Sequence, residues 1–225
     1  MPLAGGANHQ PVFLELIGPA GAGKSSLSRL LARRESVTRT SIWETPESHL
    51  ALDSIRTLPT LAALSMRARA LLWQEFKHVV RVRDLRRRMN RMGGRLVVLD
   101  EGPVYTVTWL LVSGHRSIRE GRLEQWWRRT LADWASDLDV IVVLDAADEL
   151  LAERIRSRTK PHNVKHKSDA EIYAFLDRFR SAFDRVLTEV VRERGTRVLR
   201  LAGDCESQRL ADDLVKELVG GGRGD

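Results

Sequence analysis

The chain has 225 residues, of which 43% are hydrophobic and 30% charged, a composition typical of a globular protein with a substantial core. No window approaches the ~18 apolar residues of a transmembrane helix, so we expect no membrane span. The formal net charge of +7 predicts an anionic ligand or partner. The single cysteine, Cys205, cannot form an internal disulfide, which favours a cytoplasmic location.

The two ends of the chain differ from the rest in composition. Residues 1–11 lack a cationic region followed by an apolar core, so we interpret them as a flexible leader and not as a signal peptide. The glycine-rich residues 220–225 are predicted to form a flexible tail. Because no repeat or linker interrupts residues 12–219, we predict a single domain there.

Five short apolar segments predict β-strands. Several are nearly continuous in Val, Ile and Leu, as expected for parallel strands that are covered on both faces. The segments are residues 12–17, 38–43, 95–99, 140–144 and 197–201. Helical periodicity separates them at residues 24–34, 61–92 (one long helix or a broken pair), 118–136, 148–158, 169–193 and 207–219.

This alternation of strands and helices predicts an α/β fold, specifically a three-layer, doubly wound, five-stranded parallel sheet. Ligands of such sheets bind beyond the carboxyl ends of the strands. The candidate functional residues should therefore follow the strands directly. A further apolar run, residues 103–112, is interpreted as a helix packed on the sheet, with an apolar acceptor pocket as the alternative.

The first strand leads into the sequence GPAGAGKS, residues 18–25, which fits the pattern G-x-x-x-x-G-K-[ST] between a strand and a helix. The glycines let the backbone turn tightly, so that successive N–H groups converge on an anion at a helix N-terminus. Lys24 is expected at the β- and γ-phosphates, and the Ser25 hydroxyl at Mg²⁺. The predicted nucleotide-binding set is Gly18, Ala20, Gly21, Ala22, Gly23, Lys24, Ser25 and Ser26.

Acidic residues follow the third and second strands. Asp100 and Glu101 come at the end of the third strand, where a carboxylate can hold Mg²⁺ or accept a proton from a nucleophile. The alternative is a helix cap before Pro103. Glu44 follows the second strand and is a candidate base, with Glu47 as its competitor. The pair Asp100-Glu101 also matches ATPases in which the glutamate polarises water, which keeps hydrolysis open.

A basic segment follows the fourth strand and its helix. Residues 154–167, RIRSRTKPHNVKHK, contain no acidic residue. Arg154 and Arg158 share a helix face, and Lys160 follows. Because a transferring phosphoryl group carries charge on its equatorial oxygens, arginines closing over it would stabilise the reaction. We therefore predict a lid at about residues 154–168, against the alternative of a solvated basic loop.

These segments together resemble the P-loop nucleoside and nucleotide kinases, especially thymidylate kinases and deoxyribonucleoside kinases. The resemblance extends over residues 12–219 and includes the phosphate loop, ETPE, LDEGPVY and VVLDAADELLAERIRSRTK. It implies a P-loop fold with a lid, ATP as donor, Mg²⁺ at Ser25 and Asp100, and catalytic roles for Lys24, Arg154 and Arg158. It also implies Asp100 or Glu101 at the acidic site, phosphate binding by Lys160, and Gly203 and Asp204 beside the adenine.

Two positions depart from these families. The arginine that they carry after the third strand is missing, because Asp100-Glu101 is followed by glycine and proline. In WQEFKHV, residues 73–79, Glu75 stands where thymidylate kinases carry an arginine. Both changes favour an acceptor with a hydroxyl group over a nucleoside monophosphate, although Lys77 and the arginines from Arg81 onwards could compensate.

The remaining aromatic and basic residues are interpreted as structural. Helix packing is favoured over a stacking wall for Trp109, Trp126, Trp127 and Trp134. The arginine cluster of residues 81–95 is interpreted as a solvated helix face, with nucleic-acid binding as the alternative. The histidines at positions 78, 115, 162 and 166 show no metal-ligand pattern and are interpreted as surface or lid residues.

The sequence thus predicts a cytoplasmic ATP-dependent kinase that acts on a small-molecule acceptor and uses Mg²⁺. Two alternatives stay open: a P-loop NTPase that hydrolyses ATP or GTP in association with a partner, and a polynucleotide kinase. Nucleic acid is not favoured as a partner, and a homodimer is compatible with the sequence. The acceptor and the choice between ATP and GTP are not determined.

Overall fold

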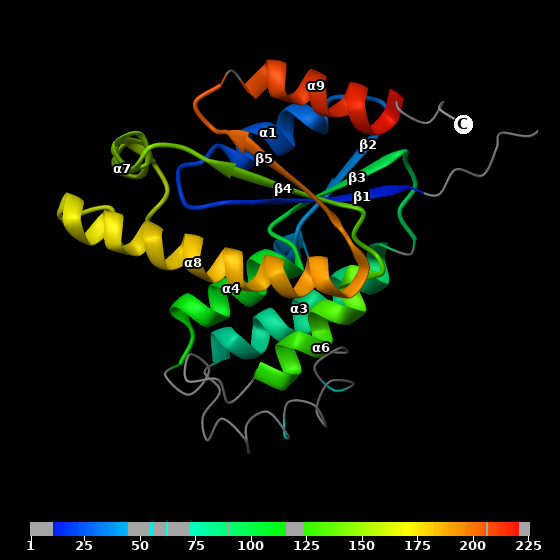
Figure 1. Ribbon diagram of the computed structural model, residues 1–225, viewed down its shortest axis with the longest axis horizontal. Coiled ribbons are helices and arrows are strands. Elements are labelled where there is room, and N and C mark those ends of the chain that lie inside the picture. Colours follow the sequence, from blue (N-terminus) through cyan, green and yellow to red (C-terminus); the bar gives the residue numbers. More distant parts are fainter. Residues whose placement is uncertain are drawn as a thin grey trace, which may run out of the picture.

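The computed structural model describes residues 11–44, 73–89, 91–115, 124–205 and 207–220, together with positions 55 and 62. It contains one five-stranded parallel sheet in the order β2-β3-β1-β4-β5 (Figure 1). The strands are β1 (Val12–Ile17), β2 (Val37–Thr40), β3 (Leu96–Asp100), β4 (Val140–Asp145) and β5 (Arg197–Ala202). The predicted α/β fold is confirmed.

The register of the central strands places the candidate site. On β1, Leu16 pairs with Asp100 of β3, and Ile17 pairs with Val143 of β4. The turns that follow β1, β3 and β4 therefore leave the sheet at the same edge, as parallel pairing requires. The phosphate loop is thereby placed between the acidic turn after β3 and the segment after β4.

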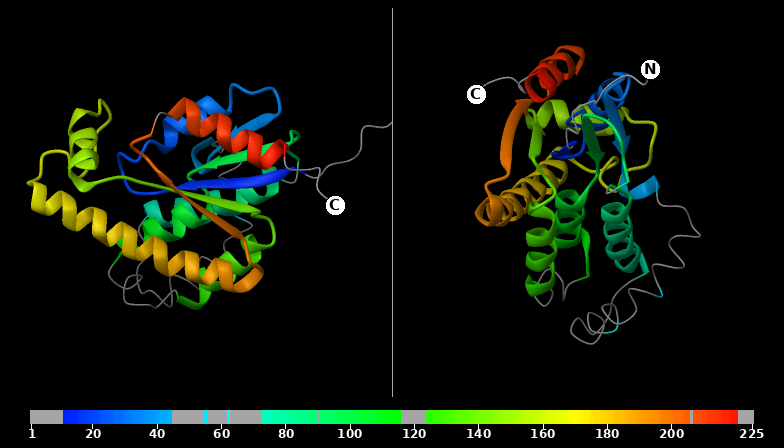
Figure 2. Two further views of the ribbon diagram at one scale, coloured as in Figure 1. Left: turned by 45° about the horizontal axis from the view of Figure 1, so that its top comes forward. Right: turned by 90° about the vertical axis from the view of Figure 1, so that its right-hand side faces the viewer.

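Helices cover both faces of the sheet and give the three predicted layers (Figures 1 and 2). On one face lie α1 (Lys24–Leu31) and α9 (Ser207–Gly220), which contact each other. On the other face lie α3 (Trp73–Met89), α4 (Pro103–Ser113), α6 (Glu124–Ala135) and α8 (Asp169–Arg194). The remaining helix, α7 (Asp148–Ser157), stands beyond the carboxyl end of β4.

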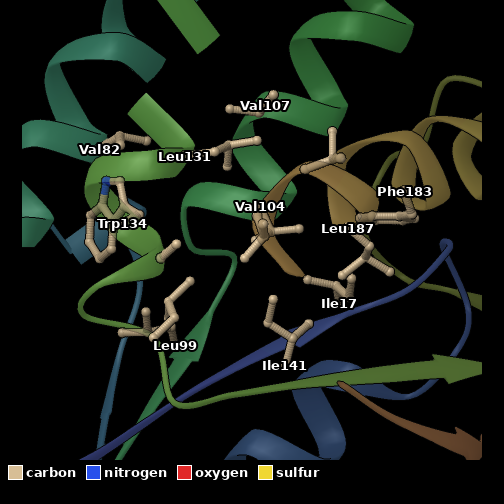
Figure 3. Close-up of a cluster of buried hydrophobic side chains, with 14 of the residues drawn as sticks. Ile17, Val82, Leu99, Val104, Val107, Leu131, Trp134, Ile141, Phe183 and Leu187 are labelled. Carbon is tan, nitrogen blue, oxygen red and sulfur yellow. The ribbon is translucent and has the colours of Figure 1, made fainter. Parts of the chain in front are cut away.

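The larger core cluster fills the space between the sheet and the second helical layer (Figure 3). It joins Ile17 and Ile141 of the sheet to side chains of α3, α4, α6 and α8. Trp127 and Trp134 are each 2% exposed within it. Burial of aromatic side chains of this size contributes strongly to stability, so packing is the role of both tryptophans, as predicted.

The element boundaries differ from the predictions in a few places. β2 ends at Thr40 and not at residue 43, because the chain turns there into a 3₁₀ helix, Ile42–Glu44. The run 103–112 is helical, as α4. Of the predicted helix 61–92, the structure describes position 62, α3, which ends at Met89, and residues 91–92, which are not helical. Its earlier part otherwise lies outside the described residues. The same holds for residues 118–123, Glu47, the leader 1–10 and the tail 221–225.

The helix after the basic segment is sharply delimited. Ser168 caps the N-terminus of α8 and forms a reciprocal capping box with Glu171, and Gly195 ends the helix in a left-handed conformation. Arg180 of α8 binds both carboxylate oxygens of Asp145, at 2.8 and 3.0 Å, and also Asp148. These bonds fix α8 to the end of β4.

None of the helices within the described ranges has the length and apolarity that crossing a bilayer requires.

Candidate active site

The phosphate loop adopts a backbone that only glycine tolerates at three positions. Gly18, Gly21 and Gly23 have φ values of 141°, 87° and 92°. A Cβ on Gly18 would lie 2.0 Å from the carbonyl oxygen of Leu144 on β4. The loop is therefore pressed against the end of the neighbouring strand, and α1 begins at Lys24 with its N–H groups directed at the loop.

Lys24 is folded over the loop that precedes it. Its Nζ atom donates to the carbonyl oxygens of Gly18 at 2.7 Å and Pro19 at 2.8 Å. Removal from water lowers the pKa of Lys24 to about 8, and Glu101 and Asp100 oppose this effect. Below that pH the side chain is a cation that can exchange the two carbonyls for phosphate oxygens.

A cleft of about 640 Å³ opens in front of the loop. Its described lining contains five cationic side chains and one carboxylate, that of Glu101. The cations are Lys24, Arg29, Arg154, Arg158 and Lys160. Gly18, Ala20, Gly21, Gly23, Ser25, Ser26 and Gly203 also line the cleft, so the structure brings most of the predicted site together. Such a surplus of positive charge suits a polyphosphate.

Four predicted residues do not line this cleft. Ala22 is buried beneath the phosphate loop, and Asp204 is exposed next to Gly203. Glu44 lies at the end of the 3₁₀ helix after β2. Asp100 is 4% exposed and lies at the end of β3, beside the loop but not on the cleft surface.

The basic segment reaches the cleft through residues with different contacts. Arg154 donates from Nη1 to the carbonyl oxygens of Gly203 at 2.8 Å and Gly21 at 3.3 Å, so it links the loop after β5 to the phosphate loop. The Arg158 guanidinium lines the cleft without a hydrogen bond or ion pair to any described residue. His162 packs edge-on against Phe175 of α8, at 5.4 Å between ring centroids.

Asp100 uses one of its two carboxylate oxygens within the protein. Oδ2 accepts from Ser28 Oγ at 2.8 Å and from Arg39 Nη2 at 2.9 Å. Oδ1 is buried and has no hydrogen-bond partner among the described residues. A buried acceptor without a donor is costly, so this oxygen suits a bound cation or its water. This carboxylate oxygen and the Ser25 hydroxyl, which lines the cleft, are both of the ligand type that Mg²⁺ prefers.

Glu101 is the one described non-glycine residue with positive φ, at 67°. Holding this conformation costs about 1–3 kcal/mol, which the surrounding contacts must offset. Burial raises the pKa of its carboxyl group, and a hydrogen bond from the Trp43 indole opposes that effect. The residue is therefore fixed in backbone and side chain at the edge of the cleft.

Glu15, on β1, is a functional candidate that the sequence reasoning missed. It is fully buried and accepts the N–H groups of Gly102, Val104 and Tyr105 at 2.9–3.1 Å. A Cβ on Gly102 would lie 2.7 Å from its carboxyl carbon. Glu15 thus caps α4 and holds the turn that carries Glu101. The available signal was a charged residue inside an otherwise apolar strand.

Arg39 was also missed, because it sits in the middle of a short strand. Besides Asp100, it binds Glu44 Oε1 from Nη1 at 3.1 Å and Ser28 Oγ from Nε at 3.1 Å. The candidate base Glu44 and the candidate metal ligand Asp100 are therefore joined by one guanidinium. The kinase families carry an arginine after the third strand, and this chain lacks it there. At the same edge of the sheet, Arg39 of β2 supplies an arginine instead.

A family model described as an AAA domain matches residues 15–174. The chain belongs to this AAA-domain family. No curated protein matches the sequence.

Solved structures resemble the fold of this AAA-domain chain at low identity. A deoxyadenosine kinase from M. mycoides with bound dATP is 12% identical, with a TM-score of 0.55, covering 92% of this chain and 98% of that one. Thymidylate kinase from Candida albicans is also 12% identical, with a TM-score of 0.55, covering 94% and 92%. These likenesses confirm the predicted P-loop nucleotide-kinase fold.

In this AAA-domain chain, Glu75 does not support the predicted preference for a hydroxyl acceptor over a nucleoside monophosphate. It is 1% exposed, and its carboxylate accepts the backbone N–H of His115 just after α4. The carboxylate therefore supports the end of a helix. The local sequence could not show this, because the donor lies 40 residues away.

One interpretation of the α3 region was wrong. His78 is not a surface residue: it is 4% exposed and stacks on Trp109 at 4.2 Å between ring centroids. The arginine cluster is exposed at Arg83 and Arg87, as expected, while Arg86 pairs with Asp137 at 2.6 Å and Arg88 with Asp84 at 2.9 Å. The partners of His78 and Arg86 come from other segments of the chain, whereas Asp84, the partner of Arg88, lies one turn earlier on α3 itself.

Proposed function

We propose that the protein is an ATP-dependent phosphotransferase that uses Mg²⁺ and moves the γ-phosphoryl group to a hydroxyl of a small molecule. The observation that carries this proposal is the cleft in which the phosphate loop faces the basic segment and a single described carboxylate. Loop amides and Lys24 would bind the phosphates, and Arg158 and Lys160 would approach from the opposite side. Gly203 and Asp204 would lie beside the adenine.

Ser25 and Asp100 would hold Mg²⁺, which neutralises phosphate charge when bound. In the reaction, the acceptor oxygen bonds to the γ-phosphorus while the bond to the bridging oxygen breaks and ADP leaves. The hydroxyl proton passes to a carboxylate, for which Glu44 and Asp100 are the candidates. Lys24, Arg154 and Arg158 stabilise charge on the transferring group, so catalysis consists mostly of positioning and electrostatics.

The acceptor is proposed to be a hydroxyl compound without a phosphate. Arg39 is the cation closest to the two candidate bases, and it is already paired with Asp100 and Glu44. An anionic group placed there would meet two carboxylates and no unpaired arginine from β2. Nucleosides, sugars and aminoglycosides satisfy this requirement, whereas nucleoside monophosphates do not.

A second candidate function is ATP or GTP hydrolysis in association with a partner. It is favoured by Glu101, whose carboxyl group lines the cleft and has a pKa raised by burial, as suits a base for water. A polynucleotide kinase is less supported, because Arg86 and Arg88 already have acidic partners.

Acceptor-dependent release of ADP tests the proposal. The protein with MgATP is screened against nucleosides, nucleoside monophosphates, sugars and aminoglycosides, with Lys24→Ala as the inactive control. A kinase shows slow ADP release alone and fast release with one acceptor class. Strong acceptor-free release that Glu101→Gln abolishes would instead establish the hydrolase. Fast release with a nucleoside monophosphate would keep the kinase and reject the proposed acceptor class.

A further inference from the structure

A kinase of the proposed kind must avoid transferring its phosphoryl group to water. Glu101 is the only carboxylate among the described residues that line the cleft, so it is the group best placed to act on water there. The inference below rests on the proposed phosphotransferase function. It concerns what keeps this carboxylate from supporting hydrolysis.

Glu101 is tied to the turn after β2 at two points. The indole Nε1–H of Trp43 donates to Oε2 of Glu101. The backbone N–H of Ile42 donates to the carbonyl oxygen of Glu101 at 3.3 Å. The side-chain bond occupies one lone pair of Oε2 and makes the carboxylate a weaker acceptor for a proton. The backbone bond holds the turn after β2 against the turn after β3.

Trp43 is 48% exposed. Its indole ring is nevertheless held in place by neighbouring side chains. The guanidinium of Arg81 lies 4.5 Å from its ring centroid. His78 packs edge-on to it at 5.2 Å, and His78 in turn stacks on Trp109 at 4.2 Å. Cation–π and aromatic contacts of this kind are each worth about 0.5–1.5 kcal/mol, so the direction of the indole N–H is fixed by α3 and α4.

We propose that Trp43 is a positioning residue that locks the Glu101 carboxylate through its indole N–H and thereby suppresses transfer of the phosphoryl group to water. In hydrolysis, the water oxygen would bond to the γ-phosphorus, the bond to the bridging oxygen would break, and ADP would leave. The water proton would pass to a Glu101 oxygen. A carboxylate held by the indole cannot turn to follow the water, and one of its oxygens already accepts a hydrogen bond.

Trp43→Phe tests this without a known acceptor. Phenylalanine keeps an aromatic ring between Arg81 and His78 but has no N–H. We expect acceptor-free ADP release from MgATP to rise by about tenfold. This is less than the roughly hundredfold that a fully positioned general base contributes at the lower end of its range. The Kd for MgATP, measured by calorimetry, should stay within about twofold. Trp126→Phe, the same substitution on α6 away from the cleft, is the matched control and should change neither quantity.

The double variant Trp43→Phe/Glu101→Gln separates positioning from simple loosening of the fold. If Trp43 acts through Glu101, the added glutamine removes the gain completely. A lost structural contact could lower activity, but it would not produce a gain that depends on one carboxylate. Should Trp43→Phe fold poorly, Arg81→Met loosens the indole from the other side and should give a smaller rise in the same direction.

Several results would overturn the inference. The first is a folded Trp43→Phe protein that binds MgATP normally but hydrolyses it no faster than the wild type. A rise that persists in the double variant is another. If the wild-type protein gives no calorimetric signal with MgATP, the proposed function itself fails and the inference falls with it. That outcome is seen before any hydrolysis is measured, so the two failures are distinguishable.

Discussion

Replacing Glu15 by glutamine should abolish a pH dependence of stability that this single carboxyl group creates. Burial raises the pKa of Glu15 to about 8, against an ordinary value of 4.5, although three backbone N–H groups lower it. Below pH 4.5 both the folded and the unfolded chain carry the proton, and the contribution to stability is complete. Between pH 4.5 and about 8 only the folded chain keeps it. Stability therefore falls as the pH rises through this window.

The size of this effect follows from linkage. At about 1.4 kcal/mol per pH unit, the loss across the window is on the order of 5 kcal/mol. Urea unfolding at half-unit intervals from pH 5 to pH 9 measures it, with the difference between wild type and Glu15→Gln isolating this group. Glutamine has the shape of the protonated acid and does not titrate. A difference that is constant with pH would refute the reasoning. A stability gain with rising pH would mean that the three N–H groups outweigh burial.

Three further outcomes are expected. Lys24→Ala should abolish calorimetric binding of MgATP, and wild-type affinity should fall as the pH rises above about 8, where the lysine loses its charge. Arg158→Ala should lower kcat by about a hundredfold or more with an unchanged Tm, whereas Arg154→Ala should lower Tm because two carbonyls lose their donor. Gly18→Ala should give a protein that limited proteolysis degrades rapidly, because the new Cβ would lie 2.0 Å from Leu144 O.

The fold was predictable because its signals are local. The strands β1, β3 and β4 are almost wholly apolar, and the phosphate-loop motif lies in one stretch between β1 and α1. Pairing of parallel strands then determines that the loop and Asp100 meet at the same edge. The end of β2 was missed by three residues because Ile42 and Trp43 extend the apolar pattern while the backbone turns.

The site was predictable only in part, because its supporting contacts are between distant residues. Glu15 binds amides 87 to 90 residues away, and Arg39 binds Asp100 across 61 residues. No spacing rule connects such pairs. Sequence motifs identify side chains that touch a ligand, whereas the groups that orient them are selected by three-dimensional proximity.

The two sides of the cleft are therefore organised differently. The acidic turn is held before any ligand arrives by Glu15 from β1, Arg39 from β2 and Trp43 from the 3₁₀ turn. Such preorganised groups need no rearrangement during the reaction. Across the cleft, Lys160 is exposed, and the Arg158 guanidinium has no hydrogen-bond or ion-pair partner among the described residues. Ordering these long side chains has an entropic cost that falls on the step in which they engage the phosphates. Substitutions in the basic segment should consequently change kcat more than KM, while substitutions around the acidic turn should change which acceptor, water included, receives the phosphoryl group.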